Sequence, residues 1–170
     1  MIYGNVEGFK EYFTLRGKGE NLYEWDDDKI QSALLVASEW LDSQFETLWI
    51  GYKTGGFTQE RSWPRTAAST CFFPYHLYKN DDIPEQVVKA TYEAAYRECN
   101  EPDCLDTDFK PSRYKNVSVS GAVSVEYNDL VFSAADSQLE IPVIQKLMEP
   151  LIDPEKVGSL SSLSGQVVRG

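Results

Sequence analysis

One histidine and three cysteines are the side chains of this sequence best suited to nucleophilic or metal chemistry. The histidine, His76, stands in an aromatic stretch, and the cysteines are Cys71, Cys99 and Cys104. A Ser-His-Asp or Cys-His site would have to use His76, and a small hydrolase built on it is the enzymatic alternative. Zinc needs four ligands at defined spacings, which this set does not offer. We therefore predict reduced structural thiols, no metal site, no cofactor and no enzymatic activity.

Carboxylates are abundant, and three of them follow one another at Asp26, Asp27 and Asp28. A calcium loop would require alternating ligands and a glutamate at its twelfth position, and that pattern does not follow. Acidic residues at the start of a helix instead accept hydrogen bonds from its unpaired amides and interact favourably with the positive end of the helix dipole. Gly55 and Gly56 are not followed by the Gly-Lys-Ser/Thr of a phosphate-binding loop. These carboxylates therefore predict a helix cap.

The net charge of the chain bears on whether it binds nucleic acid. The chain has 16 basic and 27 acidic residues, a net charge of −11. A protein that grips nucleic acid displaces counterions with Lys and Arg, and the closest basic group here, Lys110, Arg113 and Lys115, lies beside Asp106 and Asp108. The balance disfavours tight DNA binding but allows a surface that DNA passes without adhering. The sequence predicts neither a membrane span nor a secretory signal.

The hydrophobic pattern predicts a mainly α fold. Helical periodicity appears in four stretches, residues 8–17, 26–48, 83–99 and 141–152. Strict alternation over residues 114–127 predicts a β element, either one long strand kinked at Gly121 or two short strands. We expect a small bundle of about four helices with this hairpin or strand element. The domain spans residues 1–152, and an extended C-terminal tail spans residues 153–170.

An aromatic loop over residues 49–78 is long for a compact domain, and loops of that length are usually functional. Its most distinctive part contains Gln59 and the run Trp63-Pro64-Arg65. An arginine offers five donors that fit carbonyls or carboxylates, within one subunit or across an interface. Both alternatives stay open, although Trp and Arg are frequent interface anchors. A hairpin over residues 53–57 is a further prediction for this loop.

The C-terminal segment is rich in Ser and Gly but also carries apolar side chains, which a plain spacer does not need. A frayed terminus is the usual fate of chain ends. We favour a segment that folds onto a partner. The candidate partner-binding residues are Leu160, Leu163, Gly165, Val167, Val168, Arg169 and Gly170.

Four segments, in order, resemble one known family. They are residues 6–17, Gly51-Tyr52-Lys53-Thr54 with Trp63-Pro64-Arg65-Thr66, residues 83–93 and residues 119–127. The chain thereby resembles the head-to-tail connector, or adaptor, proteins of tailed phages, which are often called DnaT-like single-stranded-DNA-binding proteins. Residues 71–78 and 100–110 depart from the family pattern.

The resemblance implies a structural protein of the virion neck, assembled in the host cytoplasm. Its subunits would form a ring, a dodecamer, around the channel through which double-stranded DNA passes without specific binding. The portal protein would bind one face through the C-terminal segment, and a tail or nozzle protein would bind the other. The family's DnaT-like name implies the alternative, a replication accessory protein that binds single-stranded DNA.

Overall fold

Helices form most of the structure, a computed structural model that describes residues 1–22, 24–70, 74–105, 118–119, 123–124 and 141–161. The elements in chain order are α1 (Val6–Thr14), α2 (Gly19–Leu22), α3 (Asp27–Phe45), β1 (Tyr52–Lys53), η1 (Gly56–Thr58), β2 (Arg65–Thr66), α4 (Glu85–Asn100), β3 (Ser118–Val119), β4 (Val123–Ser124), α5 (Pro142–Met148), η3 (Glu149–Leu151) and α6 (Pro154–Ser161). The predicted mainly α fold is confirmed, and the four predicted helices correspond to α1, α3, α4 and α5.

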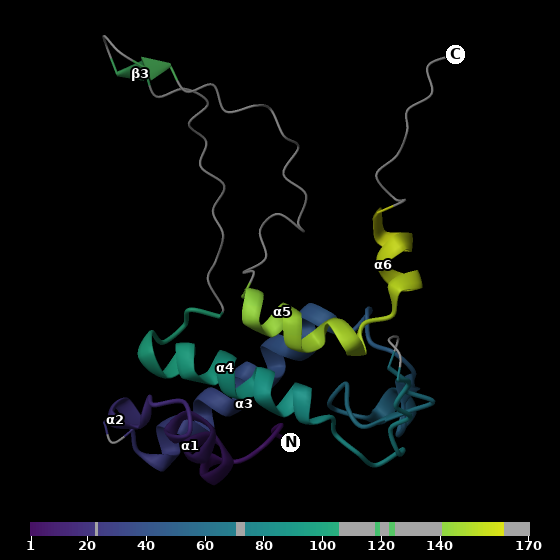
Figure 1. Cartoon of the computed structure of the whole chain (residues 1–170), viewed down its shortest axis with the longest axis horizontal. Coiled ribbons are helices and arrows are strands. Elements are labelled where there is room, and N and C mark those ends of the chain that lie inside the picture. Colours follow the sequence, from purple (N-terminus) through teal and green to yellow (C-terminus); the bar gives the residue numbers. More distant parts are fainter. Residues whose placement is uncertain (23, 71–73, 106–117, 120–122, 125–140, 162–170) are drawn as a thin grey trace.

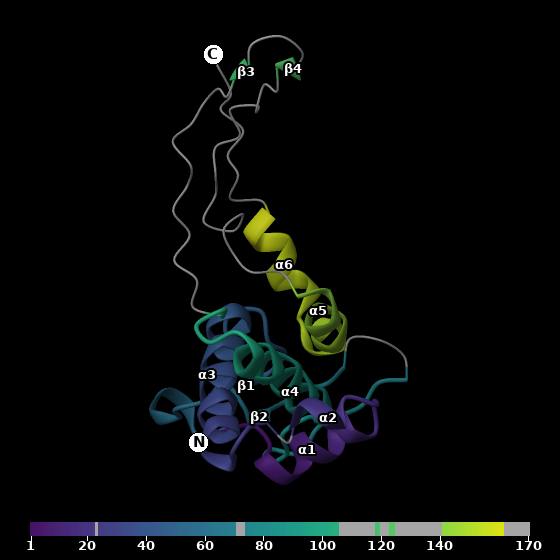
Figure 2. The same cartoon turned by 90° about the vertical axis from the view of Figure 1, so that its left-hand side faces the viewer.

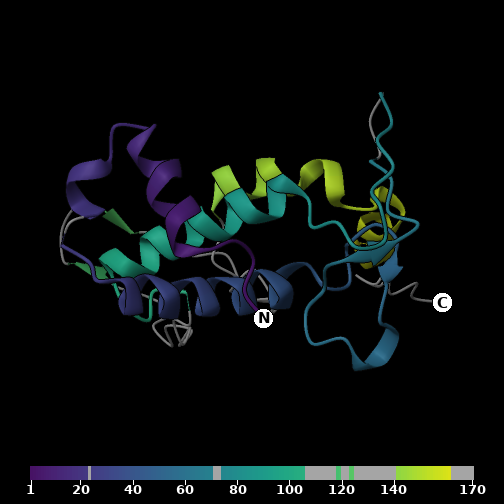
Figure 3. The same cartoon turned by 90° about the horizontal axis from the view of Figure 1, so that it is seen from below.

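The long helices α3 and α4 lie side by side, and α5 packs against α4 (Figure 1). Viewed from below, α1 and α2 lie at one end of this bundle, and the loop between α3 and α4 lies with α6 at the other (Figure 3). We call the second end the loop end. None of the helices in the described ranges is long and apolar enough to cross a membrane.

Helix α3 begins where the aspartates predict. The Asp26 side chain accepts a hydrogen bond from the Lys29 amide at 2.7 Å, as a helix N-cap does. Its apolar stripe, which includes Ile30, Leu34 and Leu41, is fully buried in the bundle core. The predicted cap is confirmed, and the predicted stripe is buried as far as Leu41, whereas Phe45 and Leu48 at its end are only half-buried.

The end formed by α1 is held by aromatic rings. Phe13 lies 4.4 Å from Tyr96 of α4 between ring centroids, and Phe9 meets Tyr92 edge to face at 5.9 Å. The backbone at Gly4 has φ +85° and presses against the Tyr92 ring, so that a Cβ there would lie 2.5 Å from a ring carbon. We call Phe9, Tyr12, Phe13, Trp25, Tyr92 and Tyr96 the aromatic cluster.

The strands are short. β1 pairs antiparallel with β2, Tyr52 opposite Thr66 and Lys53 opposite Arg65. The predicted hairpin over residues 53–57 is wrong in its pairing, because the 3-10 turn η1 occupies residues 56–58 and the partner strand comes later. β3 pairs antiparallel with β4, which selects two short strands from the alternatives for residues 114–127. The other residues of that β element lie outside the described part.

Helix α6 occupies the start of the segment that we expected to be extended. The Asp153 carboxylate accepts a hydrogen bond from the Glu155 amide at 3.1 Å, and Pro154 stands at the first helical position. Both are helix start signals, and the Ser/Gly-rich composition of the following residues does not prevent the helix. Figure 2 shows α6 running away from α5.

Candidate interaction surface

Arg65 uses its guanidinium inside the loop. Its Nε donates to the Ile50 carbonyl at 2.7 Å, its Nη1 to the Ser62 carbonyl at 3.1 Å and its Nη2 to the Gly51 carbonyl at 2.8 Å. The side chain is buried, and this burial lowers its pKa. One arginine of β2 thus joins the segment that leads into β1 to the segment that leads into β2.

Gln59 and the Trp63-Pro64 pair complete this arrangement. The Gln59 amide accepts from the Gly55 N–H at 2.7 Å and donates to the carbonyls of Arg61 and Pro64 at 2.8 and 3.0 Å. Trp63 is fully buried, with its ring centroid 5.8 Å from that of Trp49, and the peptide bond before Pro64 is cis. The contacts described for Gln59, Trp63, Pro64 and Arg65 all lie within the chain.

A second arginine was missed in the sequence. Arg61 is only 4% exposed, and its Nε donates to the Met1 carbonyl at 2.6 Å. Its Nη2 donates to Glu39 at 3.1 Å, and its Nη1 lies 3.8 Å from Asp42. No local pattern could reveal this role, because its partners are about 20 and 60 residues away in the sequence.

The N-terminus is tied to the same place. The Tyr3 hydroxyl donates to Asp42 Oδ1 at 2.7 Å and accepts from the Trp63 amide at 3.0 Å. Burial raises the pKa of both Tyr3 and Asp42. We call Tyr3, Asp42, Arg61, Trp63 and Arg65 the polar framework of the loop. It holds an irregular loop in one conformation without a regular sheet.

Large apolar side chains project from this framework into solvent. Tyr52 is 73% exposed, Phe57 is fully exposed, and Tyr75 and Leu77 are about as exposed as Tyr52. We call these four the exposed loop residues. Exposed apolar side chains on a fixed backbone are typical of surfaces that bind a partner. Sequence reasoning found the loop but did not separate these residues from the buried ones.

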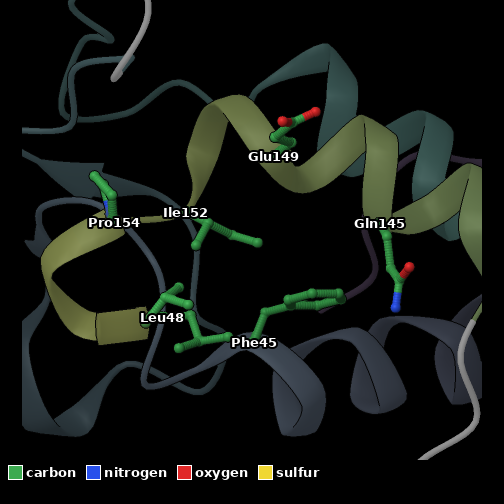
Figure 4. Close-up of a pocket in the computed structure, with 7 residues that line it drawn as sticks. Phe45, Leu48, Gln145, Glu149, Ile152 and Pro154 are labelled. Atoms are coloured by element: carbon green, nitrogen blue, oxygen red, sulfur yellow. The ribbon is translucent and has the colours of Figure 1, made fainter. Parts of the chain in front are cut away.

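A groove lies between the end of α3 and the start of α6 (Figure 4). Its volume is about 610 Å³. Phe45, Leu48 and Ile152 point into it, and Gln145 and Glu149 stand on its rim (Figure 4). Its lining is mainly apolar, and it is completed by Pro154 and Val157.

The basic side chains are largely committed to contacts within the chain. Among the described residues, ion pairs join Lys10 to Asp27, Lys53 to Glu46, Lys89 to Glu85, Arg97 to Glu93 and Lys156 to Asp153. Arg16, Lys18 and Lys29 lie over aromatic rings. In this part of the chain, Arg65, Lys79 and Lys146 have neither an ion pair nor a ring contact, and Arg65 donates to three backbone carbonyls instead.

The structure describes three of the four nucleophile candidates. His76 is exposed, its amide donates to Thr70 Oγ1 at 2.8 Å, and its ring packs edge to face on Tyr78. Burial raises the pKa of Cys99 and of Cys104 to about 11, so both thiols are protonated at neutral pH. In the described ranges, no group of three or more His, Cys, Asp or Glu could hold a metal ion. Cys71 lies outside these ranges.

The predicted docking residues fall mostly beyond the described part. Leu160 belongs to α6, whereas Leu163, Gly165, Val167, Val168, Arg169 and Gly170 follow the last described residue. Their role in partner binding stays a prediction.

Comparison with known proteins gives one match. The sequence model of the family described as "Putative DnaT-like ssDNA binding protein" matches residues 3–170, and the chain therefore belongs to this family. No curated protein and no solved structure matches the chain. The predicted DnaT-like family is thus confirmed. Its description favours the alternative of single-stranded DNA binding over the phage connector.

Proposed function

We propose that this member of the DnaT-like family is a structural assembly subunit, a head-to-tail connector that forms a ring between a portal and a tail. In this proposal it binds proteins, catalyses no reaction and lets double-stranded DNA pass through the ring. The observation that carries the proposal is that most of the basic side chains in the described part of the chain are engaged in contacts within it.

Tight binding of a phosphate backbone requires cations that can exchange small counterions for phosphates. The two arginines of the loop are buried, and Lys53 already pairs with Glu46. A phosphate would have to displace these partners, and the net charge of −11 would oppose its approach. The same charge suits a channel wall along which DNA slides.

Protein partners explain the exposed loop residues better. Phe57 and Tyr52 lie on a backbone that the polar framework holds in place, so little conformational entropy is lost when they are buried. Large aromatic side chains of this kind anchor protein interfaces. We assign this surface to the contact with a portal or with a tail protein.

Native mass spectrometry of the chain with a portal protein tests the connector. The expected result is a ring of identical subunits bound to the portal ring. Phe57→Ala should weaken that complex while leaving the monomer folded, and Leu15→Ala is a matched control, because Leu15 is exposed at the far end of the bundle. A persistent monomer with no portal association would overturn the proposal.

Single-stranded DNA binding is the second candidate, and the family description is the observation that favours it. The exposed rings of Tyr52, Phe57 and Tyr75 are of the type on which unpaired bases stack. This function would require Lys79 and basic residues outside the described part to contact the phosphates. Loss of oligonucleotide affinity in both Phe57→Ala and Lys79→Ala would support it.

A further inference from the structure

The groove beside α6 is an apolar surface with no occupant among the described residues. Val157 on its wall is 46% exposed, and Phe45 and Leu48 are only half-buried. Apolar side chains on opposite walls that face a common space are typical of a site that takes in other apolar side chains.

The groove walls are fixed to the bundle. The Ile50 amide donates to the Leu151 carbonyl at 3.0 Å, and the Asp153 amide donates to the Leu48 carbonyl at 2.8 Å. The Lys156 ammonium donates to the Trp49 carbonyl. The start of α6 is therefore tied to the end of α3, and the groove is preformed.

The remaining C-terminal residues have the chemistry that this groove fits. Residues 162–170 follow α6 directly and carry Leu163, Val167 and Val168. Their one charged side chain is Arg169. The rim of the groove presents Glu149, which has no ion-pair partner among the described residues and would complement that charge.

We propose that the groove binds residues 162–170 of a second copy of this chain. Helix α6 contributes Val157 to the groove wall and then runs away from α5 (Figure 2). The chain would have to reverse direction to enter its own groove, whereas it can continue into the groove of a neighbour.

If each subunit gives its segment to one neighbour and receives a segment from another, the contact is heterologous, and such contacts form a ring when the rotation between subunits closes. In this proposal the C-terminal segment binds a neighbouring subunit of the ring, whereas the resemblance in the sequence implies that it binds the portal. This inference concerns only the contact between copies of the chain. If that contact does not form, the portal contact of the proposed function is still tested separately by native mass spectrometry with the portal protein.

Sedimentation velocity on two variants and their mixture tests the proposal. One variant lacks residues 162–170, and the other carries Val157→Lys in the groove. Each alone is expected to self-associate at least about tenfold more weakly than the full chain, because one half of every contact is missing. Mixed together, they should form a one-to-one complex, since an intact groove then meets an intact segment.

Two further variants serve as controls. Val143→Lys changes a valine of similar exposure on α5 that does not line the groove, so it should associate as the full chain does. Glu149→Lys and Arg169→Glu should each weaken association, and their combination should restore it. Thermal unfolding of every variant confirms that the bundle is intact.

Three results would overturn the proposal. The first is a full-length chain that stays monomeric at about 100 µM, well above the concentration at which a micromolar contact would form. The second is Val157→Lys associating as strongly as Val143→Lys. The third is a mixture of the two defective variants that forms no complex although the full chain does.

Discussion

The two ends of the bundle are held together by different interactions. At the α1 end, the aromatic cluster packs ring against ring, with centroids between 4.4 and 6.5 Å apart. At the loop end, Trp63 also packs against Trp49 and Tyr78, but two buried arginines in addition donate to backbone carbonyls and to a carboxylate. Hydrophobic packing tolerates side chains of similar volume. Each hydrogen bond of the polar framework, by contrast, needs one particular donor and acceptor, so the end that presents the exposed loop residues is the less tolerant of substitution.

Trp63→Ala should have the largest effect on stability. The ring is fully buried against Trp49 and Tyr78, and its removal leaves a cavity that should lower the free energy of unfolding by about 3–5 kcal/mol. Urea unfolding measures this change. Phe57→Ala is the control, because a fully exposed ring should change it by less than about 0.5 kcal/mol. Equal changes in the free energy of unfolding for the two substitutions would contradict the assignment of Trp63 to the buried framework and of Phe57 to the exposed surface.

Arg65→Leu should come next. It leaves the carbonyls of Ile50, Gly51 and Ser62 without their donors, and a loss of about 2–4 kcal/mol is expected from buried acceptors left unpaired. Arg65→Lys keeps the charge but cannot reach all three carbonyls, so it should recover only part of the loss. If Arg65→Lys were as stable as the original chain, the three hydrogen bonds of the planar guanidinium would not contribute to stability.

Asp42→Asn should change how stability depends on pH. Burial raises the pKa of Asp42, so the folded chain holds this proton to higher pH than the unfolded chain does. The group therefore lowers stability as pH rises above its ordinary pKa of about 4. Relative to the original chain, the variant should gain stability as pH rises above about 4. Urea unfolding across this range checks it, and a difference that shrinks with rising pH would contradict the burial of this carboxyl.

Lys53→Ala should have the smallest effect. Its ion pair with Glu46 joins side chains that are 24% and 53% exposed, and pairs of this kind contribute less than about 1 kcal/mol. Thermal unfolding at low and high salt measures the change. A loss as large as that of Arg65→Leu would show that surface pairs also hold the loop.

The helical part of this fold was predictable because its signals are local. The Asp26 cap and the stripe that contains Ile30 and Leu34 lie within one helix and follow its period. The start of α6 is also marked locally, by the Asp153 cap and by Pro154, although the Ser/Gly-rich composition of the segment favours an extended chain.

The loop end was not predictable in the same way. The sequence singled out Gln59, Trp63 and Arg65 but left open whether they act within the subunit or across an interface. Their described contacts are internal, and the link from Arg61 to the N-terminus joins residues 60 positions apart. No periodic pattern encodes such a contact. The groove likewise combines segments from α3, α5, η3 and α6 that only the fold brings together.

A titration of labelled single-stranded oligonucleotide with the full chain, at about 0.05 and 0.15 M salt, tests the central claim most directly. Because most of the described basic side chains are engaged within the chain and the net charge is −11, we expect no saturable binding up to about 100 µM protein at either salt concentration. Micromolar binding at the lower salt that falls steeply at the higher salt would contradict the connector and support the family's DNA-binding description.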